Sequence, residues 1–445
     1  MQTRGHCAAL LRKAVAYRSS ALGAQAHGPC ALPTPRHSGL HTSPQCSSAW
    51  AAAIQVAAKM AGNVVKHAND GMTIDPLRTV AKEMQLLTGD MRKLLTSAHP
   101  SLDRVAKYYL QSQGKHVRPL IVLLMSRATH VCPKNSQHNA LHSASAIDTS
   151  ISPVQILADA NPSVLCQSIK DPEPGNARSE ILPAQRRLAE ITELIHTASL
   201  LHDDVIDRSE SRRGSASANF EFGSKMAVLA GDFMLARASV ALARLRHLEV
   251  VELMSTVIAN LVEGEFMQLK NTARDEPSPE WSEETLAYYI HKTYLKTASL
   301  LSKSCRASAL LGNVDGPTVE AAYGFGRNIG LAFQLVDDML DYTQSGHHLG
   351  KPAGADLKLG LATAPLLFAW KQKPELGALV GRKFAVEGDV ERAYDLVLQS
   401  DGIEQTRALA RDYAAKAVAA ISGFPDSEAK DGLVEMARRT AERQK

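Results

Sequence analysis

Two groups of aspartates are the residues of this chain best suited to chemistry. The stretch LLHDDVIDRSESRRG places three of them close together, and FQLVDDMLDY repeats the same DDxxD spacing further along the chain. Carboxylates four residues apart lie on one face of a helix, so beside an apolar segment they would repel each other unless cations bound there. Such oxygen ligands suit Mg²⁺, which binds a few carboxylates together with phosphate oxygens and water. The candidate metal ligands are Asp203, Asp204, Asp207, Asp337, Asp338 and Asp341.

Basic residues occur around both groups. Arginine offers a bidentate fork to phosphate and lysine a compact charge, so these residues could complete a diphosphate site next to bound metal ions. The candidate phosphate ligands are Lys115, Arg118, Arg212, Arg213, Lys296 and Lys351. A solvated acidic helix end is the alternative for one DDxxD taken alone. The repeat on a second apolar segment favours the metal interpretation, because two groups facing a cavity could hold several Mg²⁺ ions and a diphosphate.

Helices are predicted to position these residues. Leu188, Ile191, Ile195 and Ala198 recur at helical spacing and mark one face of a helix that runs into the first aspartates. The chain is only 5% aromatic and shows no alternating apolar run, which argues against strands. We therefore predict an all-α fold, a bundle of roughly ten or more helices. After the first aspartates, the predicted helices are 225–246, 249–270, 283–311, 317–342, 362–371, 391–398, 403–421 and 427–443.

The N-terminal segment differs in composition from the rest. Its first acidic residue is Asp70, and the residues before it carry Arg, Ser and Ala. This composition is typical of an organellar transit peptide, so we predict a mitochondrial transit peptide over residues 1–55. A disordered tail without an address is the alternative. Helical periodicity begins at Asp75, and we predict a catalytic domain over 75–445. Within it, residues 129–183 are polar and aperiodic, which predicts a disordered insertion.

Composition excludes several other classes of protein. The formal net charge of +4 on 445 residues does not indicate a nucleic-acid partner. No segment approaches the apolar length that a membrane-spanning helix needs. The six cysteines include no CxxC pair, which argues against a disulfide framework or a structural zinc site and fits a reducing compartment.

The motif set resembles that of the trans-polyprenyl diphosphate synthases. GKHVRP, LLHDDVIDRSESRRG, GDFMLARAS, YLKTASL, FQLVDDMLDY and GKPAGADLKLG occur in the order of that family, from Asp75 onward and apart from the insertion. The resemblance implies an isoprenoid-synthase-type helical bundle around a central cavity. It also implies Mg²⁺-dependent condensation of an allylic diphosphate with isopentenyl diphosphate, in which the departed diphosphate serves as base and no side-chain nucleophile is needed.

The resemblance assigns a role to each matching residue. The metal ligands would be Asp203, Asp204, Asp207, Asp337 and Asp338, with Asp341 more distant. The allylic diphosphate would be held by Arg212, Lys296 and Lys351. The isopentenyl diphosphate would be held by Lys115, Arg118, His196 and Arg213. Thr297 and Gln334 would line the carbocation. A satisfied core histidine is the alternative for His196, although it lies seven residues before Asp203 and shares its helix face.

The residues upstream of the first aspartate predict the product length. Ala198 and Ser199 are small and lie about one turn before Asp203 in the helix. Ile195 and Ile191 lie one and two turns further from the aspartates, each turn being about 5.4 Å. An open apolar tunnel there predicts a product of about nine or ten isoprene units. With a mitochondrial address, that length suggests the ubiquinone side chain. The alternative is that these residues are small only to let two helices pack closely, with the floor of the pocket built elsewhere. A synthase with a shorter farnesyl or geranylgeranyl product is the alternative function.

The family reading also leads us to expect a homodimer, or a hetero-oligomer with a related subunit. We further expect a location in the mitochondrial matrix and peripheral membrane contact for product release. Four rival classes explain less of the sequence. An HD-type hydrolase would use His202 and Asp203 but leaves the second DDxxD unexplained, and a di-iron bundle needs two ExxH pairs where only Glu193–His196 is found. A class I terpene cyclase usually has a different second motif. An inactive partner subunit should have eroded aspartates.

Overall fold

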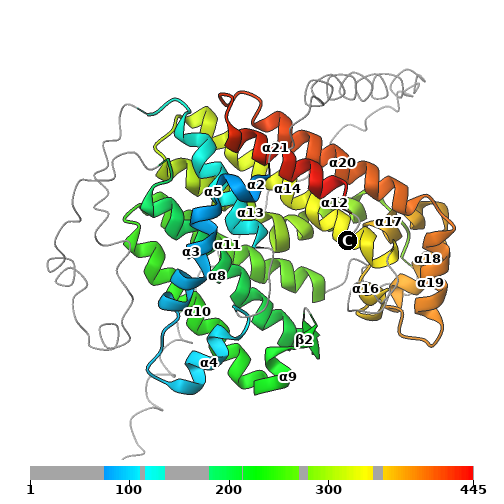
Figure 1. Ribbon diagram of the computed structural model, residues 1–445. Coiled ribbons are helices and arrows are strands. Elements are labelled where there is room, and N and C mark those ends of the chain that lie inside the picture. The colour runs from blue at the N-terminus through cyan, green and yellow to red at the C-terminus, as the bar shows by residue number, and fades with distance from the viewer. Residues whose placement is uncertain are drawn as a thin grey trace, which may run out of the picture. The chain divides into compact units, whose positions relative to one another are not determined.

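The computed structural model describes residues 75–110, 116–135, 180–212, 214–269, 279–343 and 354–443. Helices make up nearly all of this part of the chain, which confirms the prediction of an all-α fold (Figure 1). In the same ranges, the β-structure beyond one isolated bridge is a two-residue hairpin of β1 (Ser211–Arg212) and β2 (Ser215–Ala216). The predicted transit peptide and residues 136–179 of the predicted insertion lie outside the described residues.

The helix that carries the first aspartates is α8 (Pro183–Ile206). Proline is well suited to the first turn, where its missing N–H would have had no helical partner. The Gln185 side chain accepts a hydrogen bond from the Leu182 N–H at 3.0 Å. Most residues of α8 are buried, because the helix packs against α5, α10 and α13 on different sides. The first aspartate group therefore sits at the end of a core helix.

Four helices precede α8 in the described ranges. They are α2 (Pro76–Thr79), α3 (Ala81–Leu94), α4 (Pro100–Tyr108) and α5 (Val117–His130). Helix α4 was not predicted as a separate element. It begins where the His99 ring accepts the Leu102 N–H, with a proline at the first position. Because α5 continues to His130, the first two residues of the predicted insertion are helical.

The middle of the chain carries the second aspartate motif and the helices before it. Its elements are α9 (Ala218–Phe222), α10 (Ser224–Arg244), α11 (Leu248–Leu269), α12 (Glu283–Thr293), the π-helical turn η2 (Tyr294–Ala298), α13 (Ser299–Leu311) and α14 (Gly316–Thr343). The predicted helix over 283–311 is confirmed in extent, but η2 interrupts it. Helix α14 crosses η2 and α13 closely, because a Cβ atom at Gly326 would lie 2.6 Å from the Leu301 carbonyl oxygen and one at Gly330 2.7 Å from the Ala298 Cα.

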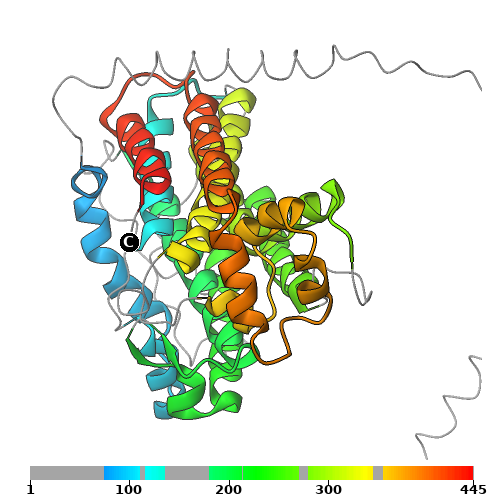
Figure 2. The ribbon, with the colours of Figure 1, turned by 90° about the vertical axis from the view of Figure 1, so that its right-hand side faces the viewer.

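The C-terminal helices pack around α14. They are α16 (Ala355–Lys358), α17 (Ala364–Gln372), α18 (Leu376–Gly381), α19 (Asp389–Leu398), α20 (Gly402–Ala420) and α21 (Glu428–Ala441). Figure 2 shows α20 and α21 side by side next to α14, and the three helices are in contact. One hydrophobic core lies among α5, α8, α10 and α13, and a second lies among α12, α14 and α16–α20. The first aspartate motif follows Leu201 of the first core, and the second motif lies between Val336 and Met339 of the second core.

Helix α10 is the one helix in the described ranges that is long and apolar enough to cross a membrane by composition alone. It is also an alanine-rich core helix, packed against α8 through residues such as Ala230 and Met234. A core helix of a soluble protein has the same composition, so this property does not identify a membrane segment.

Candidate active site

The first motif occupies the C-terminal end of α8. Asp203 and Asp204 lie in its last turn, and Asp207 caps the helix, its N–H donating to the Asp203 carbonyl at 2.8 Å. Asp204 is completely buried. Its carboxylate accepts two hydrogen bonds from Arg212 Nε at 2.8 and 2.9 Å, one from Arg212 Nη2 at 2.5 Å, and one from the Tyr109 hydroxyl. The β1–β2 hairpin delivers Arg212 to this position.

Asp203 is half-buried and faces a more mixed environment. Burial raises the pKa of Asp203 to about 6, and the negative charges of Glu265 and Asp207 add to this, while Lys296 and Arg212 oppose it. A carboxyl group that is costly to ionise in the isolated protein is one that a bound cation would stabilise. Its charge environment therefore fits the predicted role as a metal ligand.

The second motif lies on α14. The Asp338 carboxylate is buried and accepts a hydrogen bond from the Tyr289 hydroxyl at 2.5 Å and one from Gln334 Nε2 at 2.8 Å. Burial raises the pKa of Asp338 to about 6. Asp337 is more exposed and forms an ion pair with Arg443 at 2.6 Å. Asp341 accepts the N–H groups of residues 355 and 356, each at 3.1 Å, and so caps α16.

The π-turn η2 connects the two motifs. Lys296 Nζ lies 2.5 Å from Glu265 Oε2 of α11, and its charge acts on Asp203. The neighbouring Thr297 hydroxyl donates to Gln334 Oε1 at 2.9 Å, and Gln334 in turn holds Asp338. A π-turn redirects successive side chains and often marks a functional site. Here it turns Lys296 towards the first motif and Thr297 towards the second.

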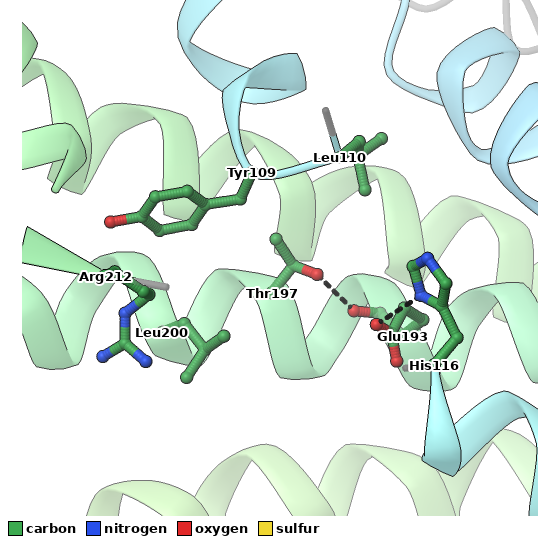
Figure 3. A pocket seen from close by; sticks show the side chains of 7 residues that line it. All are labelled: Tyr109, Leu110, His116, Glu193, Thr197, Leu200 and Arg212. Atoms are coloured by element: carbon green, nitrogen blue, oxygen red, sulfur yellow. Dashed lines mark hydrogen bonds and ion pairs between the residues drawn. The ribbon is translucent and has the colours of Figure 1, made fainter. Parts of the chain in front are cut away.

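A polar layer between α5 and α8 borders the first motif. Arg118 Nη1 lies 2.9 Å from His196 Nε2, so the two residues predicted to share a substrate do meet. His116 Nδ1 lies 3.0 Å from Glu193 Oε1, and His116 has a φ of +41°, a left-handed conformation that is uncommon for a residue with a side chain. Figure 3 shows this pair at one end of a small pocket. The residues that line it are Tyr109, Leu110, His116, Glu193, Thr197, Leu200 and Arg212.

The structure thus joins predicted site residues in three local groups, which are Arg212 with Asp204, Thr297 and Gln334 with Asp338, and Arg118 with His196. Lys115, Arg213 and Lys351 lie outside the described residues. Within the described ranges, no three His, Cys, Asp or Glu side chains gather closely enough to hold a metal ion by themselves.

Several site residues were missed by the sequence analysis. They are Tyr109, Glu265, Tyr289 and Arg443. Each contacts a predicted residue from another part of the chain, at separations such as 95 residues for Tyr109 and Asp204 and 49 for Tyr289 and Asp338. No spacing rule connects residues so far apart in one sequence.

Comparison with known proteins identifies the class of this chain. The profile of the polyprenyl synthetase family matches residues 164–397. A Neurospora crassa protein named "Probable hexaprenyl pyrophosphate synthase, mitochondrial" is 71% identical over 91% of this chain and 90% of its own length. "Decaprenyl-diphosphate synthase subunit 1" of Schizosaccharomyces pombe is 48% identical over 82% of this chain and 90% of its own. The chain belongs to the polyprenyl synthetase family.

The solved structures agree with this result. The polyprenyl synthase of Caulobacter crescentus CB15, solved with calcium and isoprenyl diphosphate, has a TM-score of 0.67 and 29% identity, covering 85% of this chain and 99% of its own. Fold, family and enzyme class were therefore predicted correctly. The protein is a prenyltransferase of the long-chain type.

Proposed function

We propose that the carboxylates of α8 and α14 bind Mg²⁺ and hold an allylic diphosphate, which is condensed with successive isopentenyl diphosphates. The main support is that two acidic motifs on separate core helices are linked through one π-turn, by Lys296 on one side and by Thr297 and Gln334 on the other. All candidate ligands are carboxylates, which are the side chains Mg²⁺ prefers. Asp203, Asp207 and Asp337 are only partly buried, so we propose their carboxylates as the main Mg²⁺ ligands.

The surrounding residues would bind and orient the substrates. Arg212 uses Nε and Nη2 for Asp204, and its Nη1 makes no hydrogen bond to the described part of the chain, so it can donate to a phosphate oxygen. Lys296 supplies a second cation from η2, and the Arg118–His196 pair supplies donors from the α5 side. Bound Mg²⁺ would neutralise the charge that develops on the departing diphosphate. Thr297 and Gln334 place oriented dipoles beside the carbon that becomes cationic. The proposed roles of Lys115, Arg213 and Lys351 rest on the resemblance.

The metal assignment is tested by single substitutions of the first aspartate of each motif, which is less buried than the second. Asp203→Ala or Asp337→Ala should lower turnover by about two or more orders of magnitude, because each removes a ligand of the Mg²⁺ that would neutralise the leaving group. Neither side chain is anchored in the core as Asp204 and Asp338 are, so the fold should persist. The measurement is Mg²⁺-dependent release of diphosphate from the two isoprenoid substrates together, with each substrate alone as control. Near-normal turnover in a folded variant would exclude the assignment.

The product proposed for this chain has six isoprene units, from the name of the relative that is 71% identical. The 48% identical relative is named for a ten-unit product. The length predicted from Ala198 and Ser199, about nine or ten units, stays a prediction and lies nearer to the second relative. Chromatography of the product of the purified chain distinguishes the two lengths.

We also propose that the protein works in mitochondria, where it makes the side chain of ubiquinone. The acid-poor start of the sequence and the name of the Neurospora crassa relative support this location. A matrix position with contact to the inner membrane suits an enzyme whose product is a long hydrocarbon, because such a product favours the bilayer over water.

A second copy of this chain is the partner we propose for the apolar surface of α10 and α11. Val262, Phe266 and Leu269 recur on one face of α11 and are 53%, 61% and 58% exposed. Leu229 on the adjoining α10 is 58% exposed. A continuous apolar surface of this kind commonly marks a protein interface. The Schizosaccharomyces pombe relative is named as a subunit, so a related chain is the alternative partner.

A further inference from the structure

The two aspartate motifs share a feature that their sequences do not reveal. In each motif the second aspartate is buried, Asp204 being 0% and Asp338 4% exposed. In each motif the first aspartate, Asp203 or Asp337, is more accessible. Burying a carboxylate is costly unless its oxygens are fully hydrogen-bonded. The second aspartates must therefore be held by specific partners.

A tyrosine hydroxyl is a partner of both buried aspartates. Tyr109, at the C-terminal end of α4, donates to Asp204 and accepts the Ala218 N–H at 2.9 Å. Tyr289, on α12, donates to Asp338 at 2.5 Å and is itself 1% exposed. Each tyrosine comes from a helix other than the one that carries its aspartate. The two contacts thus connect α4 to α8 and α12 to α14.

We propose that Tyr109 and Tyr289 are positioning residues: each fixes the buried second aspartate of one motif, so that the remaining carboxylates are held towards the metal ions. This inference rests on the metal site proposed above. The second aspartate adjoins the first in the chain, so a hydrogen bond that anchors Asp204 or Asp338 restrains the helix backbone that the two residues share. It thereby restrains the position from which the side chain of Asp203 or Asp337 projects.

A phenol is well suited to this task. It is a strong donor with no positive charge, so it satisfies a buried carboxylate without cancelling the negative charge that attracts a cation. At Asp338 the second donor, Gln334, is neutral as well, whereas at Asp204 the Arg212 guanidinium also donates and supplies a positive charge. Partners that orient metal-binding carboxylates typically change metal affinity by 10- to 100-fold when they are removed.

The chain supplies a matched control for each tyrosine. Tyr108 directly precedes Tyr109 and donates instead to the backbone oxygen of Ala216 at 3.1 Å. Tyr288 directly precedes Tyr289 and donates to the backbone oxygen of Met267 at 3.1 Å. Removal of these two hydroxyls changes the same elements and deletes one hydrogen bond each, but it leaves the aspartates untouched.

The test measures metal binding directly. Mn²⁺ replaces Mg²⁺, inorganic diphosphate serves as the anionic probe, and the signal of free Mn²⁺ is followed by electron paramagnetic resonance in the full-length protein. Tyr109→Phe and Tyr289→Phe should each raise the dissociation constant for Mn²⁺ about 10- to 100-fold. Tyr108→Phe and Tyr288→Phe should leave it unchanged. We call Tyr109→Phe and Tyr289→Phe the anchor variants. In turnover assays they should need more Mg²⁺ than the parent protein but recover most of kcat when Mg²⁺ is saturating. A protein whose fold is damaged would not recover in this way.

Each further outcome has a definite meaning. Wild-type Mn²⁺ binding in a folded anchor variant, or equal losses in anchor and control variants, overturns the proposal. The two tyrosines lie on different elements, so the second variant decides the question if the first fails to fold. Asp203→Ala and Asp337→Ala are measured alongside. If they too bind Mn²⁺ normally, the metal assignment itself is wrong and the positioning role falls with it.

Discussion

The adjacent aspartates of each motif occupy two different environments. Asp204 and Asp338 are buried and hydrogen-bonded on both oxygens, whereas Asp203 and Asp337 are only partly buried. The sequence predicts the residue types and their spacing, because both are local. It cannot predict this division of labour, which depends on Tyr109 and Tyr289 from other helices.

The raised pKa of Asp203 predicts how metal binding depends on pH. Burial and the neighbouring Glu265 and Asp207 bring this pKa to about 6, and a ligand must lose its proton before it binds metal. The concentration of Mg²⁺ that half-saturates turnover should therefore increase about tenfold for each pH unit below 6. Mg²⁺ titrations of diphosphate release between pH 5 and about 8 measure this. A half-saturating concentration that does not change with pH would contradict it.

The same raised pKa values make the stability of the metal-free protein depend on pH in the opposite direction to metal binding. The folded state holds the protons of Asp203 and Asp338 up to a pH of about 6, whereas the unfolded chain releases them near the ordinary aspartate pKa of 3.8. Folding is therefore favoured by these groups below about pH 4, and that contribution is lost as the pH rises to 6. Unfolding in EDTA at several pH values is the control for the metal titration.

Among the secondary-structure elements, long helices were predictable and local interruptions were not. The periodic segments that became α10, α11, α14, α20 and α21 are long enough for their apolar spacing to be read directly. The π-turn η2 was not predicted, because it depends on the close crossing of α14 at Gly330, where a side chain would meet the Ala298 Cα. Yet η2 carries both Lys296 and Thr297. The least predictable element is therefore one of the most important for the site.

The tunnel hypothesis belongs to helix α8. Ala198 is completely buried one turn before the first aspartates, where a growing chain would pass. Ala198→Phe should shorten the product to about three or four isoprene units while diphosphate release continues, because the ring would block the path below the metal site. Product chromatography measures the length.

The control for Ala198→Phe is the same substitution at Ala189, which is equally buried on α8 but further from the aspartates. Both changes overpack the core and should lower the free energy of unfolding by about 1–3 kcal/mol. Thermal unfolding measures this loss. The tunnel does not pass Ala198 if a folded and active Ala198→Phe protein still makes the parent's product. A similar shortening by Ala189→Phe would show that the effect comes from overpacking.

For the whole molecule, the fold could be predicted from the sequence, but the surface that would form a dimer could not. The catalytic part was recognisable from six motifs in order, and its fold and class are confirmed. The oligomeric state was not predictable in the same way, because an interface is a property of a surface that only folding assembles. Phe266 and Leu229 are distant in sequence from the aspartates, and nothing in their local pattern distinguishes them from core residues.

The apolar surface of α10 and α11 predicts a dimer that one charge should dissociate. A specific interface usually buries about 1,600 Å² in total, with the largest losses on changing a central aromatic residue. Phe266 is 61% exposed in the single chain, and Phe266→Glu would place a charge in the apolar contact. Sedimentation equilibrium should give twice the chain mass of 48.0 kDa for the parent protein and the single mass for this variant.

Leu398→Glu is the matched control, since Leu398 is 49% exposed on α19, away from this surface. A parent protein that sediments as a monomer, or a Phe266→Glu protein that remains a dimer, rules out a second copy on this face. In the first case, a related chain becomes the partner to test by co-expression.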